Sequence, residues 1–487
     1  MKNKNEGMIR MDKSIAIIGA GVSGLAAAWG LRGYPGRVVL YDKGDKIGGN
    51  CQSRWVAVGD QYRFCDLGVN DFNTRAYADV VEAMDEVGIG YSLLEDSACF
   101  HSPDGSFAYT IGGLDYHSPM PLALAAEYAR FQKEAAQDYL KDPTTRVSIG
   151  EYLTRVASPP YSEAFGSTCI FPRVNAMYFM DPTRRAEDMP FKAVMHYYIL
   201  QEGFGTAYGP LRMYFHGGAQ NWLKRLAQYL GRRIVMGADV KISAEPSGQY
   251  TVTSTQGGGA AVQELFDTVV FACQANEIAG LMQNAPVIRA VQQDVLRHIR
   301  YAPSTAYAHT YTGILPPDVN LWRTYNVTVH ADDGLTAQPH PYSMTYLCNK
   351  HQNDAQSGQH DRYGGPQILV SLNPRDDVKT ILDDEIAGRT QTRYMLWDAN
   401  THEAIKWDFP HNVLDLDGMD AQARLDAHQG QKGLYFTGGW SYGSGLHEEC
   451  WQQSQAVARA ASGAGPFSMP GLAGAAPPHI VRAMQPR

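Results

Sequence analysis

The apolar run IAII (residues 15–18) leads directly into a glycine turn, and this junction constrains the fold more than any other feature of the chain. Four apolar residues in a row are typical of a short buried strand. Gly19, Gly21 and Gly24 then follow at the spacing GxGxxG, before an alanine-rich helical segment and a second apolar run that ends on Asp42. This order of strand, glycine turn, helix and strand predicts a βαβ unit and hence a parallel sheet.

Each glycine of this turn has a separate physical task in binding a dinucleotide. Gly19 permits the tight turn, Gly21 lets a pyrophosphate approach the backbone, and Gly24 lets helix and strand pack closely. The helix N-terminus then faces the anion, which its N–H groups and dipole stabilise. Asp42 is placed to accept a ribose hydroxyl. We therefore expect this segment to bind a dinucleotide.

The glycine spacing alone does not distinguish NAD from FAD. The stretch GDKIGGNCQSR (44–54) adds a second glycine pair immediately after Asp42. Such a loop supplies further backbone donors to a long pyrophosphate ligand, and its alternative interpretation is a flexible turn. A nicotinamide dehydrogenase would need a second nucleotide fingerprint, and the sequence contains none.

Composition limits the partners and the compartment. The chain has 487 residues, of which 44% are hydrophobic, and its formal charge of -8 gives no net electrostatic reason to expect nucleic acid. The seven cysteines form no CxxC pair, so neither a zinc site nor a disulfide framework is indicated. We expect no metal and a reducing, cytoplasmic location.

The uncharged residues 14–31 resemble a signal sequence or a membrane span in their apolar character. Their fixed glycine and serine spacing and a lead-in of mixed charge favour the nucleotide-binding turn instead. We expect no transmembrane segment, leave peripheral contact with a membrane open, and make no prediction of the oligomeric state.

Several stretches together are similar to one group of flavoproteins. GAGVSGLAAAW, YDKGDKIGGNCQS and DLGVNDFN resemble the flavin-binding start of the flavin-containing amine oxidase and phytoene desaturase superfamily. Near the other end, LYFTGGWSYGSGLHEECW resembles its C-terminal flavin segment, and the match is closest to a bacterial amine-oxidase-like subgroup. The resemblance implies an α/β fold: a Rossmann-type FAD-binding domain of the GR2-like amine oxidase fold and a mixed α+β substrate-binding domain.

The implied domains are discontinuous in sequence. Residues 159–214 hold few strand signals and are predicted as a mostly helical insertion, whereas alternating strand-like runs follow. The tail is rich in Gly, Pro and Ala and has no periodicity. The predicted parts are an FAD-binding domain at 12–85, 215–282 and 402–465, a substrate-binding domain at 86–214 and 283–401, and a flexible tail at 466–487.

The resemblance implies FAD contacts from several distant segments. In the superfamily the second glycine pair lies on the phosphate and ribitol side of FAD, and residues matching Gly68 to Asn70 lie near the flavin ring. Asp42 stands where many members have Glu. The implied cofactor-binding residues are Gly19, Gly21, Val22, Ser23, Gly24, Asp42, Lys43, Gly48, Gly49, Asn50, Gly68, Val69, Asn70, Val240, Gly439, Trp440, Gly445 and Leu446.

The glycine-rich turn near the C-terminus precedes a predicted helix, HEECWQQSQAVARAA. By resemblance, its N-terminus points at the pyrimidine edge of the flavin ring, where reduced flavin carries negative charge. His447 and Glu448 are candidates for a proton or hydrogen-bond role, with a helix-start cap as the alternative interpretation. Trp440 and Ser441 stand where members that attach FAD covalently need a Cys, so we expect non-covalent FAD.

No Ser-His-Asp order stands out, so bound flavin is expected to perform the chemistry. The resemblance implies an oxidoreductase that oxidises or desaturates a C–N or C–C bond of a hydrophobic or amine substrate by hydride transfer to FAD. The alternatives are a redox-neutral double-bond isomerase of unsaturated lipids and a non-catalytic FAD-binding protein. Lys406 is a further candidate for approaching the flavin, with core support as its alternative role.

The middle of the chain is rich in aromatic residues. They are able to wall an apolar pocket for a lipid-like or aromatic substrate, and their alternative role is the ordinary core. These residues are Tyr178, Phe179, His196, Tyr197, Tyr198, Tyr208, Tyr214, Phe215, Tyr307, Tyr311 and Trp322.

Overall fold

In the computed structural model the chain forms two compact units. Unit 1 comprises Met1–Gly49, Leu226–His298 and Ala421–Met469, and unit 2 comprises Asn50–Arg225, Ile299–Asp420 and Pro470–Arg487. The structure describes residues 13–58, 61–112, 118–178, 185–206, 211–231, 233–282, 285–329, 342–352, 366–469 and 478–484.

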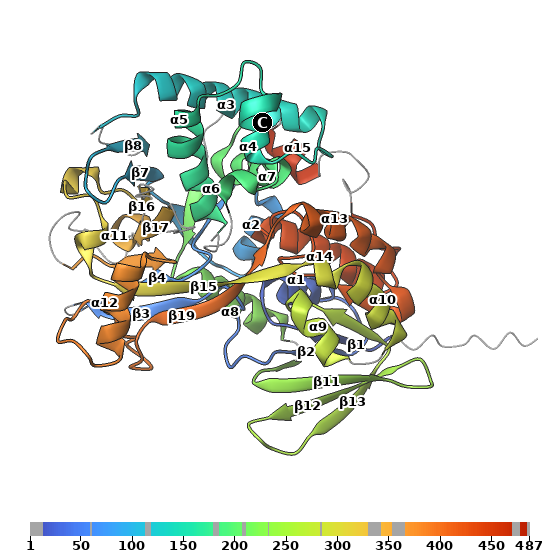
Figure 1. The fold of residues 1–487 in the computed structure, drawn as a ribbon. Coiled ribbons are helices and arrows are strands. Elements are labelled where there is room, and N and C mark those ends of the chain that lie inside the picture. Colours follow the sequence, from blue (N-terminus) through green and yellow to red (C-terminus); the bar gives the residue numbers. More distant parts are fainter. Residues whose placement is uncertain are drawn as a thin grey trace, which may run out of the picture. The chain divides into compact units, whose positions relative to one another are not determined.

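Unit 1 is built on a five-stranded parallel sheet with β1 at its centre (Figure 1). β1 pairs with β2 on one side and with β14 on the other, and every neighbouring pair is parallel. The three central strands are almost fully buried, which explains why each reads as a continuous apolar run. In sheet order the strands are β10 (Arg233–Val235), β2 (Val38–Tyr41), β1 (Ile15–Ile18), β14 (Thr268–Phe271) and β20 (Leu434–Phe436).

Two helices from opposite ends of the chain pack side by side on this sheet, one following β1 and the other following β20 (Figure 1). They run in the same direction: Gln455 Nε2 donates to the Ala26 carbonyl at 2.7 Å, and further along both helices Gly30 lies against Ala458. Gly30 has no side chain, and this permits the close approach. The helices within unit 1 are α1 (Val22–Gly30), α9 (Ala275–Leu281), α10 (Pro286–Asp294) and α14 (His447–Ala461).

A three-stranded antiparallel sheet also belongs to unit 1. Its first strand alternates buried and exposed residues, as expected for a strand with one solvent-facing side. Two further helices, α8 (Ala219–Leu230) and α13 (Leu416–Leu425), cross the boundaries between the units. The strands are β11 (Ala238–Ala244), β12 (Tyr250–Gln256) and β13 (Val262–Phe266).

Unit 2 contains a seven-stranded mixed sheet. Its neighbouring strands are antiparallel except for β16 and β7, which are parallel. In sheet order the strands are β19 (Lys406–Val413), β15 (Arg300–His309), β18 (Leu369–Leu372), β17 (Tyr342–Leu347), β16 (Tyr325–Val329), β7 (Ser97–His101) and β8 (Ala108–Gly112).

Unit 2 also contains two small sheets and a helical part. The strands are β3 (Ser53–Val58) paired with β4 (Gln61–Asp66), and β5 (Asp71–Asn73), β9 (Arg212–Phe215) and β6 (Tyr91–Leu93) in sheet order. The helices are α2 (Ala78–Glu86), α3 (Leu122–Lys141), α4 (Ile149–Glu151), α5 (Glu163–Phe165), α6 (Phe171–Met177), α7 (Phe191–Glu202), α11 (Cys348–His351), α12 (Asp376–Ile386) and α15 (Pro478–Met484).

The α/β class predicted from the sequence is confirmed, and β1, α1 and β2 form the expected βαβ unit. The units have other boundaries than the predicted domains: residues 50–85, 215–225 and 402–420 group with unit 2, and residues 283–298 group with unit 1. Strand β5, for example, pairs with β9 of the same unit. Part of the segment expected as a flexible tail forms helix α15, whose Ile480 is fully buried.

Candidate functional site

In the turn after β1, the packing of the protein requires glycine at two of the three positions but leaves room for a side chain at the third. Gly19 has φ +119°, and a Cβ there would collide with the Ala272 carbonyl. A Cβ on Gly24 would collide with the Gly19 carbonyl. A Cβ on Gly21 would instead meet its nearest neighbour, the Gly49 Cα, at an ordinary 3.8 Å. Packing therefore does not explain Gly21, whereas a ligand that approaches its backbone does.

The second glycine pair folds against this turn. Gly48 N donates to the Ala20 carbonyl at 3.1 Å, and Gly49 lies next to Gly21. Both glycines of the pair have positive φ, at +132° and +56°. The two glycine-rich loops predicted to contact a pyrophosphate are therefore brought together in unit 1.

Asp42 forms hydrogen bonds with the backbone of both loops through its two carboxylate oxygens. Oδ2 accepts from Ala20 N at 2.5 Å and Oδ1 accepts from Gly44 N at 2.7 Å. Lys43 is largely exposed and forms an ion pair with Glu277. The structure thus assigns Asp42 a role within the protein, and its contact with a ribose stays a prediction.

The N-terminus of α1 offers unshielded positive character. Gly21 is its N-cap, and among the described residues no side chain caps the helix and no acid lies in its first turn. The helix begins at Val22, so the backbone N–H groups of Val22 and Ser23 lie in its first turn. Such an end attracts an anion through its N–H groups and its dipole.

The N-terminus of α14 lies at the same edge of the sheet, because β1 and β20 run parallel and each leads into its helix. This end is capped from within: Glu449 Oε2 accepts from Ser444 N at 2.8 Å and from Leu446 N at 3.2 Å. The capping acid is therefore Glu449 and not Glu448, the residue considered from the sequence. A capped start holds the preceding turn in one conformation.

The turn before α14 is tightly specified. Gly445 has φ +75°, and a Cβ there would collide with the Gly439 carbonyl. Trp440 Nε1 donates to the Cys273 carbonyl at 2.9 Å, and Gln422 Nε2 donates to the Trp440 carbonyl at 3.0 Å. The predicted residues Gly439, Trp440, Gly445 and Leu446 thus form one rigid turn at the carboxyl end of the parallel sheet.

His447 and Glu448 are both buried at the start of α14. Burial lowers the pKa of His447 to about 4, so this side chain is neutral near pH 7. Glu448 Oε1 accepts from Gln452 Nε2 at 2.9 Å. Val240, another of the cofactor-binding residues implied by the resemblance, is buried in β11.

Other predicted residues belong to unit 2. A Cβ on Gly68 would lie 2.7 Å from the Asn50 carbonyl, so this pair is in close contact. Asn70 is buried, and Val69 is partly exposed. Lys406 Nζ lies 3.1 Å from Asp383 Oδ1 and 5.2 Å from the centre of the Tyr307 ring. Lys406 thus has partners within unit 2, and its role toward a flavin stays a prediction.

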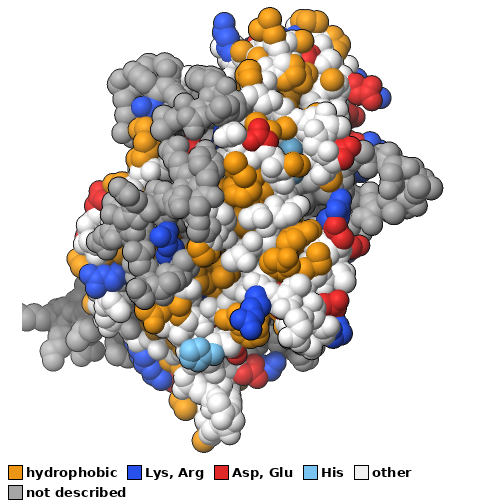
Figure 2. All heavy atoms as spheres, turned by 90° about the vertical axis from the view of Figure 1, so that its left-hand side faces the viewer, with side chains coloured by type: hydrophobic (Ala, Val, Ile, Leu, Met, Phe, Trp, Pro, Cys, Tyr) orange, Lys and Arg blue, Asp and Glu red, His pale blue; other side chains and the backbone are white. Residues whose placement is uncertain are grey.

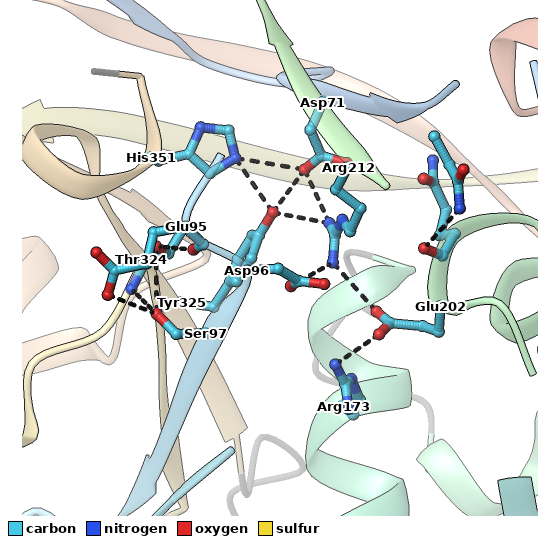
Figure 3. A network of polar contacts seen from close by, with 12 residues as sticks. Asp71, Glu95, Asp96, Ser97, Arg173, Glu202, Arg212, Thr324, Tyr325 and His351 are labelled. Carbon is cyan, nitrogen blue, oxygen red and sulfur yellow. Dashed lines mark hydrogen bonds and ion pairs between the residues drawn. The ribbon is translucent and has the colours of Figure 1, made fainter. Parts of the chain in front are cut away.

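A buried charge cluster in unit 2 was not predicted from the sequence (Figure 3). Arg212, which is 3% exposed, is at its centre. Its Nη2 lies 2.9 Å from Asp71 Oδ2, and its Nη1 lies 3.2 Å from Glu202 Oε1 and 3.4 Å from Asp96 Oδ1. Glu202 also binds Arg173, at 2.9 Å. Three carboxyl groups therefore share two guanidinium groups.

Tyr325 and His351 complete the surroundings of Asp71. Arg212 Nη2 donates to the Tyr325 hydroxyl at 2.7 Å, and this hydroxyl donates to Asp71 Oδ2 at 2.7 Å. His351 Nε2 lies 3.3 Å from the same carboxylate oxygen. The three donors converge on one acceptor, as Figure 3 shows.

The carboxyl groups of this cluster differ in acidity. Burial alone would raise the pKa of Asp71, but Arg212 and the hydrogen bonds from His351 and Tyr325 hold it below its ordinary value. Burial raises the pKa of Asp96 to about 6, with Arg212 opposing the increase. Asp71 is therefore ionised near pH 7, and Asp96 is the first of the two to accept a proton.

The sequence offered only a weak signal for this cluster. Asp71 lies in the quoted stretch DLGVNDFN, but its partners come from strands and helices far away in the chain. A charged residue next to apolar strand residues is a sign of a buried ion pair, yet it does not name the partner.

The aromatic residues of the middle region use their polar atoms within the protein. The Tyr178 hydroxyl donates to the Ala193 carbonyl, and Trp322 Nε1 donates to the Pro316 carbonyl. Tyr307, Leu347 and Leu369 belong to one packed apolar cluster that also includes Trp322. Phe179 and Tyr208 lie outside the described residues.

Comparison with known proteins identifies the fold. A family profile described as an NAD(P)-binding Rossmann-like domain matches residues 17–87. Cyclohexylamine oxidase from Brevibacterium oxydans IH-35A aligns with a TM-score of 0.59 and 16% identity, over 93% of this chain and 99% of that chain. This chain has the amine oxidase fold. A search of curated protein sequences gives no match.

Two further solved structures extend this similarity. Putrescine oxidase bound to putrescine aligns with a TM-score of 0.57 and 16% identity, over 92% of this chain and 98% of that chain. A CLA-producing fatty acid isomerase from P. acnes aligns with a TM-score of 0.62 and 15% identity, over the same shares. The resemblance to the amine oxidase superfamily is thus confirmed at the level of the fold, which oxidases and an isomerase share.

Within the described residues, no helix has both the length and the apolar composition needed to cross a membrane. No group of three or more His, Cys, Asp or Glu side chains in this part of the chain is arranged to hold a metal ion. On the face shown in Figure 2, acidic, basic and apolar side chains of the described residues are interspersed.

Proposed function

We propose that this protein is an oxidoreductase that binds FAD without a covalent bond and uses it on a small organic substrate. One observation carries the proposal: the glycine-lined N-termini of α1 and α14 lie at the same edge of the parallel sheet of unit 1. A helix N-terminus favours negative charge by roughly 0.3–1 kcal/mol at an exposed position. FAD carries a pyrophosphate, which suits the uncapped start of α1. Glu449 caps α14, so there the glycine turn before the helix is the proposed neighbour of the flavin ring.

The chemistry of the residues fits this cofactor. The backbone at Gly21 is open to an approaching group, and the uncapped start of α1 supplies N–H donors. The rigid turn before α14 carries no bulky side chain at Gly439 or Gly445. We propose as FAD contacts Gly19, Gly21, Val22, Ser23, Gly24, Asp42, Lys43, Gly48, Gly49, Asn50, Gly68, Val69, Asn70, Val240, Gly439, Trp440, Gly445 and Leu446.

When bound, the flavin supplies the ability to accept a hydride from a C–N or C–C bond. The protein contributes position and electrostatics. The neutral His447 serves as a hydrogen-bonding group and not as a cation, because burial lowers its pKa to about 4. The capped start of α14 keeps its turn in place.

A double-bond isomerase is a second candidate, supported by the similarity to the fatty acid isomerase structure. Such an enzyme would take up and return the hydride with no net oxidation. A non-catalytic FAD-binding protein is the third candidate. The fold is the same for all three, so the substrate reaction has to distinguish them.

The first experiment is a visible spectrum of the purified full-length chain, followed by acid precipitation. We expect the absorption of oxidised flavin and its release into the supernatant, where mass spectrometry identifies FAD. A colourless protein that takes up no added FAD overturns the proposal. Flavin that stays with the precipitate contradicts non-covalent binding.

The second experiment is an anaerobic screen of amines, polyenes and unsaturated fatty acids. Bleaching of the flavin followed by reoxidation and product release supports an oxidase or desaturase. A shifted double bond without oxygen consumption supports the isomerase. Flavin that stays oxidised with every compound favours the non-catalytic protein.

We propose a small organic molecule as the partner and the cytoplasm as the location, with no role for nucleic acid. The seven cysteines are free in the structure, and six of them are buried, which suits a reducing compartment. Their state in cells is measured by alkylation before and after reduction.

A further inference from the structure

Two consecutive residues hold both ends of one loop in unit 2. The loop, residues 66–71, connects β4 to β5. At its start, Gln352 Nε2 donates to Asp66 Oδ2 at 2.6 Å, and Gln352 Oε1 accepts from Asp66 N at 3.3 Å. At its end, His351 Nε2 lies 3.3 Å from Asp71 Oδ2. The pair His351 and Gln352 therefore contacts the residues that flank Leu67–Asn70 on either side.

The bond at Asp66 is one of several that fix the start of the loop. Asp66 is 2% exposed and also accepts from Ser53 Oγ and, at 3.1 Å, from Ala219 N. Gln352 is the partner that binds both the backbone N–H and the carboxylate of Asp66. Removing it leaves two buried polar groups without that partner, which weakens the anchor.

The bond at Asp71 has a defined direction. A carboxylate accepts hydrogen bonds only, and Asp71 is ionised, so Nε2 of His351 carries the hydrogen and donates it. His351 is 1% exposed, and a hydrogen bond to a charged group is stronger than a neutral one. His351 thus restrains the end of the loop from the same short helix, α11, that leads into Gln352.

The middle of the loop contains residues that we propose above as flavin contacts. Gly68 lies against the Asn50 carbonyl, and Asn70 is buried. The loop is short, so fixing both of its ends leaves its middle few alternative conformations.

We propose that His351 and Gln352 are positioning residues that set the environment of the bound flavin ring by clamping the loop 66–71 at both ends. The proposal rests on the FAD-binding function proposed above. Both residues lie more than 270 positions away from this loop in the chain. Neither contacts the flavin in this proposal, because His351 acts through Asp71 and Gln352 acts through Asp66.

The test compares four variants with the wild-type protein. Gln352→Leu and His351→Leu remove one hydrogen-bonding end each, whereas His351→Gln keeps an amide donor in place of Nε2. Asn349→Ala is the matched control: Asn349 is also buried on α11, but its side chain donates to Pro366 O at 3.2 Å and accepts from Ile368 N at 2.7 Å, both outside the loop.

Two measurements are made on each protein. Hydrogen exchange followed by mass spectrometry reports on the amides of residues 67–70, and spectroelectrochemistry reports the visible bands and the midpoint potential of bound flavin. We expect exchange about tenfold faster in the two Leu variants, the effect expected from the loss of one buried hydrogen bond. We also expect their flavin bands and potential to shift, while His351→Gln stays near the wild-type values.

The outcomes separate the clamp from the proposed function. If Asn349→Ala shifts the flavin potential as much as the Leu variants do, general destabilisation explains the effect and the proposal is overturned. Unchanged exchange at 67–70 in both Leu variants also overturns it. If the wild-type protein takes up no FAD, the proposed function and the flavin effect are both wrong, and exchange alone then decides whether the clamp exists.

Discussion

Nη2 of Arg212 lies 2.9 Å from Oδ2 of Asp71, and both side chains are less than a tenth exposed. The same guanidinium binds Glu202 and Asp96, so it neutralises charge from three separate segments of unit 2. A buried ion pair adds little when it is intact, but removal of one member leaves unpaired charge in a dry environment.

Replacing Arg212 with Met should therefore destabilise the protein by about 3–5 kcal/mol. The cause is the uncompensated burial of Asp71, since Glu202 still pairs with Arg173; urea unfolding at pH 7 measures the loss. Arg389→Met is the control, since Arg389 pairs with Asp384 at 2.6 Å on an exposed surface. That change should cost about 0–1 kcal/mol. Equal losses in the two variants would contradict this account of the cluster.

Gly21→Ala should separate binding from folding. Its Cβ would meet the Gly49 Cα at 3.8 Å, so we expect the unfolding midpoint to stay near that of the wild type. The same methyl group would obstruct a pyrophosphate at the start of α1, and FAD affinity should fall at least about tenfold, or about 1.4 kcal/mol. Flavin fluorescence during titration of the apoprotein measures the affinity.

Gly33→Ala is the control for this prediction, because a Cβ there has nothing within 4 Å. It should change neither FAD affinity nor stability appreciably. If Gly21→Ala binds FAD as tightly as Gly33→Ala does, the phosphate does not lie where we propose.

His309 should make stability depend on pH. Burial lowers its pKa from 6.5 to about 3, so the unfolded chain binds the proton more readily than the folded protein. The contribution of neutral His309 to the free energy of unfolding is complete above pH 6.5 and is lost as the pH falls toward 3. Its Nδ1 accepts from Tyr311 N, so protonation would also disrupt that bond. Between pH 7 and 4.5 the loss should be about 3 kcal/mol.

The measurement compares urea unfolding of the wild type and His309→Gln over this pH range. The variant is expected to be less stable at pH 7 but to lose less stability on acidification. Burial raises the pKa of Asp66 to about 7, so its contribution to stability changes with pH in the opposite direction to that of His309. This contribution is present in both proteins and cancels when their stabilities are compared. Parallel pH profiles would refute the role of His309.

Glu449→Ala should loosen the turn before α14. Two partly buried N–H groups, of Ser444 and Leu446, would lose their acceptor, and we expect a cost of about 1 kcal/mol, at the lower end of the range for a buried unsatisfied group. We expect lower stability and weaker FAD binding together. Glu449→Gln retains one acceptor oxygen, so its stability and FAD affinity should lie between those of the wild type and Glu449→Ala. Thermal unfolding and flavin titration measure the two quantities. A wild-type affinity in Glu449→Ala would show that the cap does not support the cofactor site.

Local patterns predicted the elements of unit 1 closely. The helix expected at HEECWQQSQAVARAA begins at His447 and ends at Ala461, as α14 does. The run at residues 15–18 forms β1, and the three glycines form the turn into α1. These features are encoded within a few neighbouring residues, because apolar periodicity and the special geometry of glycine act over one or two turns of the chain.

Other strands gave less distinct patterns. No strand is predicted from the sequence within residues 53–112, although β3 to β8 form there and β7 and β8 join the seven-stranded sheet of unit 2. Short strands in mixed sheets have no long periodic run, and their pairing depends on partners elsewhere in the chain. The parallel pairing of β7 with β16 joins residues more than 220 positions apart.

By itself the sequence determined the βαβ start, the glycine turns and the C-terminal helix, since each is a local consequence of side-chain size and spacing. Only the tertiary structure decided that Arg212 pairs with Asp71, Asp96 and Glu202. It also decided that His351 and Gln352 form hydrogen bonds with the two ends of one loop. A charge or an amide has no preferred partner along the chain, and only folding fixes which groups are buried beside it.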